Sequence, residues 1–333
     1  KMASHNPSTS TFKLNNGNSI PAVGLGTWQS ADSQTRDAVS YALQHGYRHI
    51  DTALNYQNEK EVGEGIRMSG VPRKDIWVTT KLDNPWHHRA LEGLETSLKD
   101  LGLDYIDLFL IHFPCSTDPN DSSKHLPDWD YVKTWQEMQK MLESGKVKNI
   151  GVSNFQIRHL EKLLNDPTCK VVPAVNQLEV RQYYSRDPPY HLNVRCLTLF
   201  FSCTHITHHY PTRPKLLDYC KSKGIHCTAY SCLGGNSSSP INKHTNLSDN
   251  LVVEKIAKAK GKSSAQILLK WGLQRGTSVI PKSVTPSRIS SNFDLDGWDL
   301  SDAEVAEIDA ILTRVKVVQD DWMPIKVFFG DDE

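Results

Sequence analysis

The stretch Gly24-Leu-Gly-Thr-Trp28 lies in the first apolar run of the chain. An open dinucleotide-binding sheet carries the pattern G-x-G-x-x-G at this place, because its glycines let the backbone approach a pyrophosphate. The stretch has Gly24 and Gly26 but no third glycine. Among sheets built from alternating strands and helices, it therefore favours a closed (β/α)₈ barrel over the open form.

Strand-sized apolar runs alternate with helical patterns outward from this stretch. The expected strands are 23–28, 49–54, 76–82, 106–112, 147–152, 174–179, 226–230 and 278–281. The expected helices are 33–45, 58–68, 87–101, 131–143, 157–164, 215–223, 250–259, 265–274 and 301–312. Strands that alternate with helices in this way pair in parallel through right-handed crossovers. We therefore expect an α/β protein of one domain, a (β/α)₈ TIM barrel over residues 12–313.

Composition excludes several classes of function. Lys plus Arg and Asp plus Glu number 38 each, so the balanced charge argues against nucleic acid and anionic membranes as partners. The longest apolar runs have the length of strands, so we expect no membrane span. The seven cysteines form no C-x-x-C pair, which is typical of reduced thiols in a cytoplasmic protein. His205, His208 and His209 lack acidic or cysteine partners nearby, so we expect no metal site.

Four polar residues fall at the carboxyl ends of neighbouring predicted strands, where barrels of this kind place their chemistry. They are Asp51, Tyr56, Lys81 and His112. Each alone has an ordinary explanation, such as a helix cap, a half-buried aromatic, a solvated cation or a hydrogen-bonded histidine. Their occurrence at adjacent strand ends is a stronger signal, and it makes them candidate catalytic residues.

The chemistry open to these four residues is proton donation. A tyrosine with the usual pKa of about 10 is a weak acid, and a neighbouring ammonium such as that of Lys81 lowers this pKa. Asp51 would keep Lys81 in place and charged, and His112 could orient a carbonyl oxygen. No nucleophile is paired with a base. The set therefore predicts that Tyr56 protonates a carbonyl oxygen while a cofactor delivers hydride.

Longer motifs around these residues resemble the aldo-keto reductase superfamily, and within it the fungal aldose-reductase-like and glycerol-dehydrogenase-like group. The matching stretches are Gly24-Leu-Gly-Thr-Trp28, Gly46-Tyr-Arg-His-Ile-Asp-Thr-Ala53, Leu110-Ile-His-Phe-Pro114, Gly145-Lys-Val-Lys-Asn-Ile-Gly-Val-Ser-Asn-Phe155 and Ile280-Pro-Lys-Ser283. The resemblance implies an NADP-dependent oxidoreductase on a (β/α)₈ barrel. It also implies reversible reduction of aldehydes or ketones, in which hydride leaves nicotinamide C4 and the tetrad tyrosine, Tyr56, donates the proton.

The resemblance also implies the residues that hold NADPH. At the nicotinamide and pyrophosphate they are Gly26, Thr27, Asp51, Ser153, Asn154, Gln177, Tyr230, Ser231 and Leu233. At the adenosine 2′-phosphate and adenine they are Lys282, Ser283, Arg288 and Asn292. A dianionic phosphate suits Lys and Arg beside a helix that begins near Pro286, whatever the family. Ser291 departs from relatives, which often carry Glu there.

The substrate pocket is expected to be aromatic and to take a small carbonyl compound. Its implied residues are Trp28, Trp86, His112, Phe113 and Trp322. Relatives usually have Trp at the position of Phe113, so a wider pocket is expected. Residues 314–333 are expected to form a tail over the active-site mouth, and residues 1–11 a disordered lead-in. Relatives of this type are commonly monomers, and we expect the same here.

Residues 181–207 form an atypical insertion where relatives have a short loop. A structureless loop of this length is uncommon inside a compact domain. The segment could add substrate contacts, form a surface excursion or be translated intron sequence. Its composition and abrupt boundaries favour the third explanation. Two functional alternatives also stay open: a catalytically impaired or non-enzymatic NADPH-binding barrel, for example because of this insertion, and a barrel isomerase or lyase without nicotinamide.

Deleting residues 181–207 is expected to preserve or improve soluble NADPH-dependent activity, because the four catalytic candidates precede the insertion. Expression of the soluble protein and its rate of aldehyde reduction check this. A deletion variant that folds but has lost its activity would instead identify the segment as a functional loop.

Overall fold

The computed structural model describes residues 8–180, 214–234, 250–311, 318 and 320–329. Its central feature is an eight-stranded sheet with the order β12-β11-β10-β9-β6-β5-β4-β3 and parallel neighbours throughout. The strands are β3 (Leu25–Gly26), β4 (His49–Asp51), β5 (Trp77–Leu82), β6 (Leu108–Ile111), β9 (Ile150–Ser153), β10 (Val175–Glu179), β11 (His226–Tyr230) and β12 (Ser278–Val279). Apart from ends that differ by a few residues, they are the eight predicted strands.

The sheet closes on itself between its first and last strands. Parallel bridges join Val23 to Val279 and Gly26 to Lys282, and the Gly24 N–H donates to the Val279 carbonyl over 2.9 Å. The predicted (β/α)₈ barrel is therefore confirmed. The two glycines of the opening stretch serve this closure. A Cβ on Gly24 would lie 2.6 Å from His49 Nδ1, and a Cβ on Gly26 would lie 2.8 Å from the Ile280 carbonyl.

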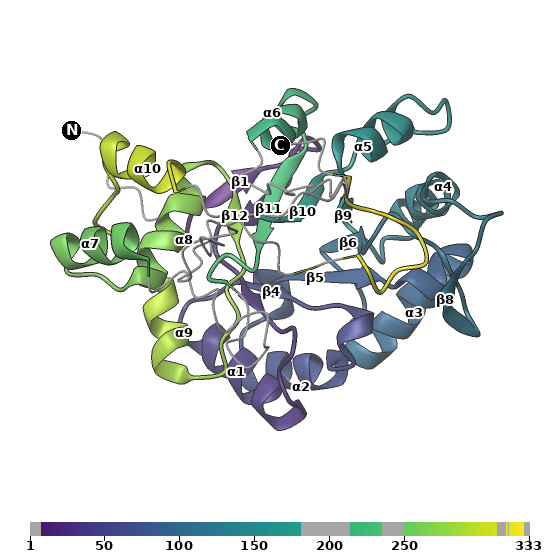
Figure 1. Cartoon of the computed structure of the whole chain (residues 1–333). Coiled ribbons are helices and arrows are strands. Elements are labelled where there is room, and N and C mark those ends of the chain that lie inside the picture. The colour runs from purple at the N-terminus through teal and green to yellow at the C-terminus, as the bar shows by residue number, and fades with distance from the viewer. Residues whose placement is uncertain (1–7, 181–213, 235–249, 312–317, 319, 330–333) are drawn as a thin grey trace, which may run out of the picture.

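Helices surround the strands, as Figure 1 shows. They are α1 (Asp32–Gln44), α2 (Glu59–Ser69), α3 (Ala90–Leu101), α4 (Tyr131–Met141), α5 (Ile157–Leu164), α6 (Pro214–Ser222), α7 (Leu251–Lys260), α8 (Ser264–Gln274), α9 (Pro286–Phe293) and α10 (Asp302–Asp309), with short 3₁₀ turns η1 (Leu54–Tyr56), η2 (Arg73–Asp75), η3 (Asn84–Arg89) and η4 (Leu142–Ser144). Each long helix buries one face. In α3, Leu94, Leu98 and Leu101 recur at helical spacing and are buried in the main core.

A hairpin that the sequence analysis did not predict covers the opposite end of the barrel from the strand carboxyl ends. It consists of β1 (Thr11–Lys13) and β2 (Ser19–Pro21), paired antiparallel. Ile20 of this hairpin packs with Leu108 and Val175, which begin β6 and β10. Described contacts of the chain begin a few residues before the expected barrel boundary at residue 12. The Ser8 N–H donates to Asp296 over 2.9 Å, and β1 already begins at Thr11.

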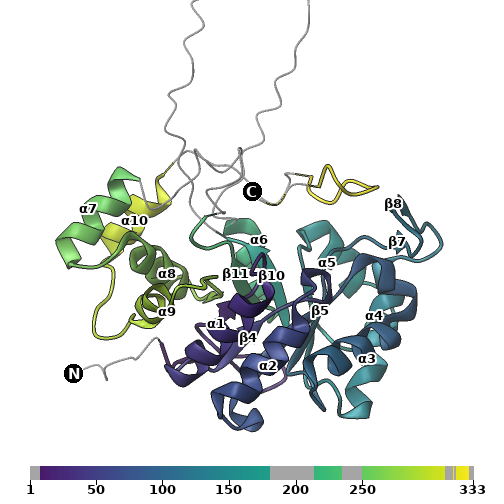
Figure 2. The same cartoon turned by 90° about the horizontal axis from the view of Figure 1, so that it is seen from below.

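Other segments refine the expected domain boundaries. A two-stranded ladder, β7 (Thr117–Asp118) with β8 (Asp121–His125), follows β6 and was not predicted. In Figure 2 it lies on the same side as the yellow tail around residues 320–329. The expected insertion at 181–207 and residues 1–7 lie outside the described residues. In the part of the chain that the structure describes, no helix is long and apolar enough to cross a membrane.

Four histidines are held as neutral groups, and one of them is His226, whose pKa burial lowers to about 4. Burial lowers the pKa of His49 and of His87 to about 3 each, and burial followed by the charge of Lys81 lowers the pKa of His112 well below its usual value. One carboxyl group shifts in the opposite direction: burial raises the pKa of Glu59 to about 7, although the Thr80 hydroxyl donates a hydrogen bond to it.

Stability of the free protein is therefore expected to fall as the pH drops from 6.5 to about 5. In this window the unfolded chain gains four histidine protons that the folded chain rejects, whereas the folded chain keeps one Glu59 proton that the unfolded chain loses. The net uptake on unfolding lowers the free energy of unfolding by about 2–4 kcal/mol per pH unit. Urea titrations across this range check the slope. His87→Asn should make it shallower, and substitution of the exposed His45 by Gln should not.

Candidate active site

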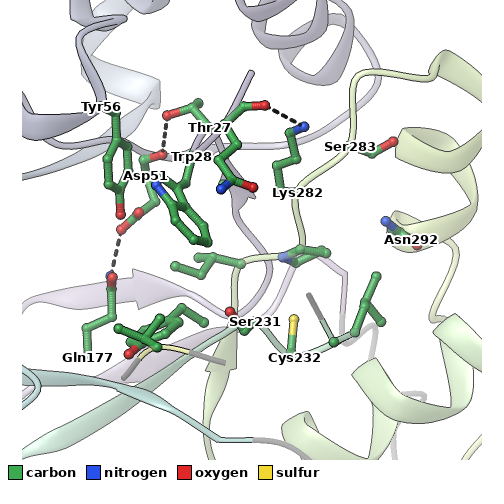
Figure 3. A pocket seen from close by; sticks show the side chains of 18 of the residues that line it. Thr27, Trp28, Asp51, Tyr56, Gln177, Ser231, Cys232, Lys282, Ser283 and Asn292 are labelled. Carbon is green, nitrogen blue, oxygen red and sulfur yellow. Dashed lines mark hydrogen bonds between the residues drawn. The ribbon is translucent and has the colours of Figure 1, made fainter. Parts of the chain in front are cut away.

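A cavity of about 1340 Å³ opens where the strands of the barrel end. Most of the predicted site residues line it. They are Gly26, Thr27, Trp28, Asp51, Tyr56, His112, Phe113, Ser153, Asn154, Gln177, Tyr230, Ser231, Leu233, Lys282, Ser283, Arg288, Asn292 and Trp322. In Figure 3, Tyr56 and Gln177 lie on one side of the cavity and Ser283 and Asn292 on the other. Residues from both halves of the sequence therefore form one elongated site.

Lys81 lies behind the cavity and connects the other tetrad residues. Its Nζ donates to Asp51 Oδ1 over 2.6 Å, to the Thr52 carbonyl over 2.7 Å and to the Tyr56 hydroxyl over 3.3 Å. Both Lys81 and Asp51 are buried, with side chains 1% and 2% exposed. Since three acceptors surround the ammonium group, Lys81 has one fixed position and points at the tyrosine oxygen. β4 and β5, which are neighbours in the sheet, hold this pair together.

Burial dominates the acidity of Tyr56. It raises the pKa of the hydroxyl well above the usual value, and the charge of Asp51 raises it further. In the free protein the net shift of this pKa is therefore upward, opposite to the lowering that the sequence analysis expected from Lys81. The consequence is that Tyr56 holds its proton at neutral pH. An alkoxide is a stronger base than phenolate, so it can still take this proton, and the Lys81 ammonium lies close enough to stabilise the phenolate left behind.

His112 borders the same side of the cavity as Tyr56. The two rings meet edge to face with centroids 5.7 Å apart. Burial lowers the pKa of His112, so the ring is neutral, and its buried Nδ1 has no hydrogen-bond partner. A neutral ring beside the Tyr56 hydroxyl is suited to orienting a carbonyl oxygen through a hydrogen bond.

Buried amides and hydroxyls form the wall next to the tetrad. Gln177 Nε2 donates to Asp51 Oδ2 over 2.6 Å, and the Ser153 hydroxyl donates to the Gln177 carbonyl over 2.9 Å. Asn154 accepts from the Tyr230 hydroxyl over 2.7 Å and donates to the His112 carbonyl over 2.9 Å. These bonds fix groups from β9, β10 and β11 against the tetrad. The wall offers amide and hydroxyl groups to a planar carboxamide such as that of nicotinamide.

Strained backbone is concentrated around this cavity. In the described part of the chain, four non-glycine residues have left-handed φ angles, at Gln29 (56°), Gln57 (58°), Asn154 (64°) and Ser231 (49°). Three of them line the cavity, and Gln57 directly follows Tyr56. Such conformations are costly for side-chain-bearing residues and persist where surrounding contacts enforce them, which is common at functional sites.

The far side of the cavity has the features of a phosphate and adenosine site. Lys282, Ser283 and Arg288 line it beside the first turn of α9, which begins with Pro286. Two cationic side chains next to backbone N–H groups suit a dianionic phosphate. Lys282 Nζ instead donates to the Gln29 carbonyl over 3.1 Å, so it would exchange this acceptor for a phosphate oxygen. These residues fit NADPH, and Arg288 with Lys282 would hold its 2′-phosphate.

The structure adds lining residues that the sequence analysis missed. They are Gln29, Asn55, Cys232, Gly234, Ser263, Ser264, Ala265, Ile280, Pro281, Val284, Thr285, Ser287, Ser291, Val318 and Asp321. Ser263 to Ala265 form the first turn of α8, where Ser263 and Gln266 cap each other. That capping pattern is visible in the sequence and marks a second helix N-terminus at the adenosine side. Asp321 carries no such local signal.

The expected aromatic pocket forms only in part. Phe113 stacks on His112 with centroids 4.9 Å apart, and Trp322 meets Phe113 edge to face at 5.4 Å. Trp28 also lines the cavity and is 43% exposed. Trp86 is not among the lining residues that the structure describes, and the Arg89 guanidinium instead lies over its ring at 4.0 Å.

The described residues also contain no group of three or more His, Cys, Asp or Glu suited to a metal ion.

Comparisons with known proteins agree with this geometry. The model of the aldo/keto reductase family matches residues 22–199 and 201–313, which is most of the chain. The chain belongs to the aldo/keto reductase family. Glycerol 2-dehydrogenase (NADP(+)) of Saccharomyces cerevisiae is 38% identical to this reductase over 96% of this chain and 97% of that protein. D-galacturonate reductase of Hypocrea jecorina is 43% identical over 87% and 88%.

Solved structures extend the comparison to the fold. An aldo-keto reductase of Bombyx mori, solved in complex with NADP, is 36% identical and superposes with a TM-score of 0.77 over 94% of this chain and 96% of its own. Family membership and these relatives make the protein an NADP-dependent oxidoreductase that reduces aldehydes or ketones.

Proposed function

We propose that Tyr56 is the proton donor of this carbonyl reduction, with Lys81, Asp51 and His112 completing the catalytic set. The observation that carries the proposal is the contact of 3.3 Å between Lys81 Nζ and the Tyr56 hydroxyl, at the wall of a cavity that continues to Lys282 and Arg288. NADPH bound in this cavity supplies a hydride to the carbonyl carbon. Tyr56 then protonates the oxygen, which His112 orients.

The other residues act on binding and on position. Ser153, Asn154 and Gln177 hold the carboxamide of the nicotinamide, and Tyr230 packs on its ring. The proposed pyrophosphate and ribose contacts are Gly26, Thr27, Ser231 and Leu233, and Asn292 contacts the adenine. Trp28, Phe113 and Trp322 exclude water around the carbonyl. Trp86 was expected at the substrate as well, but it does not belong to the described lining of the cavity. In the reverse direction the same residues oxidise an alcohol, with the Tyr56 phenolate as the base.

We further propose that the protein acts as a cytoplasmic monomer without a nucleic-acid partner. Acidic and basic residues balance at 38 each, which argues against a nucleic-acid partner. Residues 12–313 would form the barrel and 314–333 the tail over its mouth, with 181–207 as an insertion. Light scattering of the purified protein tests the monomer: a mass of one chain supports it, and twice that mass contradicts it.

Consumption of NADPH in the presence of glyceraldehyde tests the proposed function. We expect turnover that depends on both compounds and a clear preference for NADPH over NADH. Folded protein that binds NADPH tightly without turnover would favour the non-enzymatic alternative. Protein that does not bind NADPH at all would favour an isomerase or lyase.

A further inference from the structure

We infer that Asp321 is a specificity-determining residue that selects neutral hydroxyaldehydes over aldehydes that carry a carboxylate. This inference rests on the proposed function, since it concerns the substrate side of the same cavity. Relatives named for glycerol and for D-galacturonate are 38% and 43% identical to this chain, so identity does not choose between a neutral and an anionic substrate. The charge of the described residues around the cavity mouth favours a neutral substrate.

Asp321 lies at the Tyr56 side of the cavity. It lines the cavity together with its neighbour Trp322. Trp322 meets Phe113 at 5.4 Å, Phe113 stacks on His112 at 4.9 Å, and His112 meets Tyr56 at 5.7 Å between ring centroids. This series of aromatic contacts runs from the tail to the proposed proton donor. Asp321, as the neighbour of Trp322, therefore lies beside the part of the cavity where the remote end of a carbonyl substrate would enter.

The position of Asp321 is fixed by the residue before it. One carboxylate oxygen of Asp320 accepts hydrogen bonds from the backbone N–H groups of Val327 and Phe328, each over 2.7 Å. Residues 320–328, which we call the tail hook, are thereby closed into a turn. Met323, Val327 and Phe328 of the hook pack with Phe113 and Cys115 in a separate apolar cluster. The Phe329 N–H then donates to Gln156 over 2.9 Å, which ties the end of the hook to the barrel.

No cation offsets Asp321 among the described residues. Asp321 itself is exposed and forms no ion pair. Lys282 and Arg288 line the opposite side, next to α9, and Lys81 is bound to Asp51. Among the described residues of the tail and its contacts, the cations Lys326 and Arg158 lie over the Phe329 ring at 5.6 and 3.8 Å and are not part of the lining.

The expected consequence is charge discrimination. A carboxylate on the substrate would approach Asp321 with no compensating cation among the residues that the structure describes. This raises the free energy of the substrate in the bound and transition states alike. Hydroxyl groups can instead donate hydrogen bonds to Asp321. Because Asp321 faces solvent, the effect is screened and modest, so removing the charge should change the preference about threefold and reversing it about tenfold.

D-galactose and D-galacturonate provide a matched pair of substrates, since they differ in the carboxylate at C6. The experiment compares kcat/KM for both sugars in the full-length protein and in Asp321→Asn and Asp321→Lys. We expect galactose to be preferred, with the preference falling about threefold in Asp321→Asn and reversing or falling about tenfold in Asp321→Lys. The change should lie in KM. It should also shrink as salt rises from 0.05 to 0.5 M, because surface charges are then screened.

Asp104→Asn is the matched control, because Asp104 is exposed and precedes β6 at the opposite end of the barrel. It should leave the ratio unchanged. Equal ratios in the parent protein, Asp321→Asn and Asp321→Lys, or a change that salt does not affect, would overturn the inference. Glyceraldehyde is assayed alongside, so that a failure of the proposed function can be told apart from a failure of the role assigned to Asp321. If glyceraldehyde is reduced, the outcome concerns Asp321 alone; if no aldehyde is reduced, the proposed function fails and the inference with it.

Discussion

Tyr56→Phe is expected to reduce kcat for aldehyde reduction about a thousandfold while NADPH affinity stays nearly unchanged. The substitution removes the proposed proton donor and little else. Lys81 keeps its two shorter contacts, with Asp51 at 2.6 Å and the Thr52 carbonyl at 2.7 Å, so the buried ion pair and the barrel remain in place. Steady-state rates with glyceraldehyde and a fluorescence titration with NADPH measure the two quantities separately.

Tyr219→Phe is the matched control for this variant. Tyr219 lies on α6 and does not line the cavity, so loss of its hydroxyl should leave both kcat and NADPH affinity unchanged. If Tyr56→Phe kept most of its rate, the proton would have to come from another group, and His112 would be the next candidate because it meets the Tyr56 ring at 5.7 Å.

Arg288→Ala is expected to weaken NADPH binding about ten- to a hundredfold and to leave NADH binding nearly unchanged. Arg288 lines the cavity beside α9, and a guanidinium is the side chain best suited to paired hydrogen bonds with a phosphate. NADH lacks the 2′-phosphate, so its affinity should not depend on the Arg288 side chain. Dissociation constants for both nucleotides, measured by fluorescence titration at one ionic strength, check the expectation.

Lys258→Ala is the control for general charge effects, since Lys258 is exposed on α7 and lies outside the lining. It should not alter the preference between NADPH and NADH. Equal weakening of both nucleotides by Arg288→Ala would show that the guanidinium does not recognise the 2′-phosphate. Discrimination would then have to come from Lys282 or Ser283.

The barrel could be predicted because its decisive features are local in sequence. The missing third glycine after Gly26 and the eight strand-sized runs needed no knowledge of tertiary contacts. The catalytic set was equally accessible, since Asp51, Lys81 and His112 fall within a residue of a strand's carboxyl end and parallel neighbours bring such ends together. The pattern did not show why residues 24 and 26 must lack a side chain. Gly24 lies in close contact with His49, and Gly26 lies in close contact with Ile280.

The features that were missed depend on contacts between distant segments or on burial. The strands of the hairpin β1–β2 have three residues each, too short for a clear alternation of apolar and polar side chains. The raised pKa of Tyr56 results first from burial, which cannot be read from spacing. Asp320 forms the tail hook through backbone groups seven and eight residues away, and an acidic pair in a tail carries no sequence signal for such bonds.

Transfer of deuterium from NADPH labelled at nicotinamide C4 to glyceraldehyde tests the central claim most directly. The account predicts that the full-length protein forms glycerol with deuterium on the former carbonyl carbon, in proportion to the NADPH consumed. It also predicts that Tyr56→Phe, although it binds NADPH, forms almost none. Folded protein that binds NADPH and yields no labelled alcohol, or a Tyr56→Phe variant that yields as much as the parent, would contradict the account.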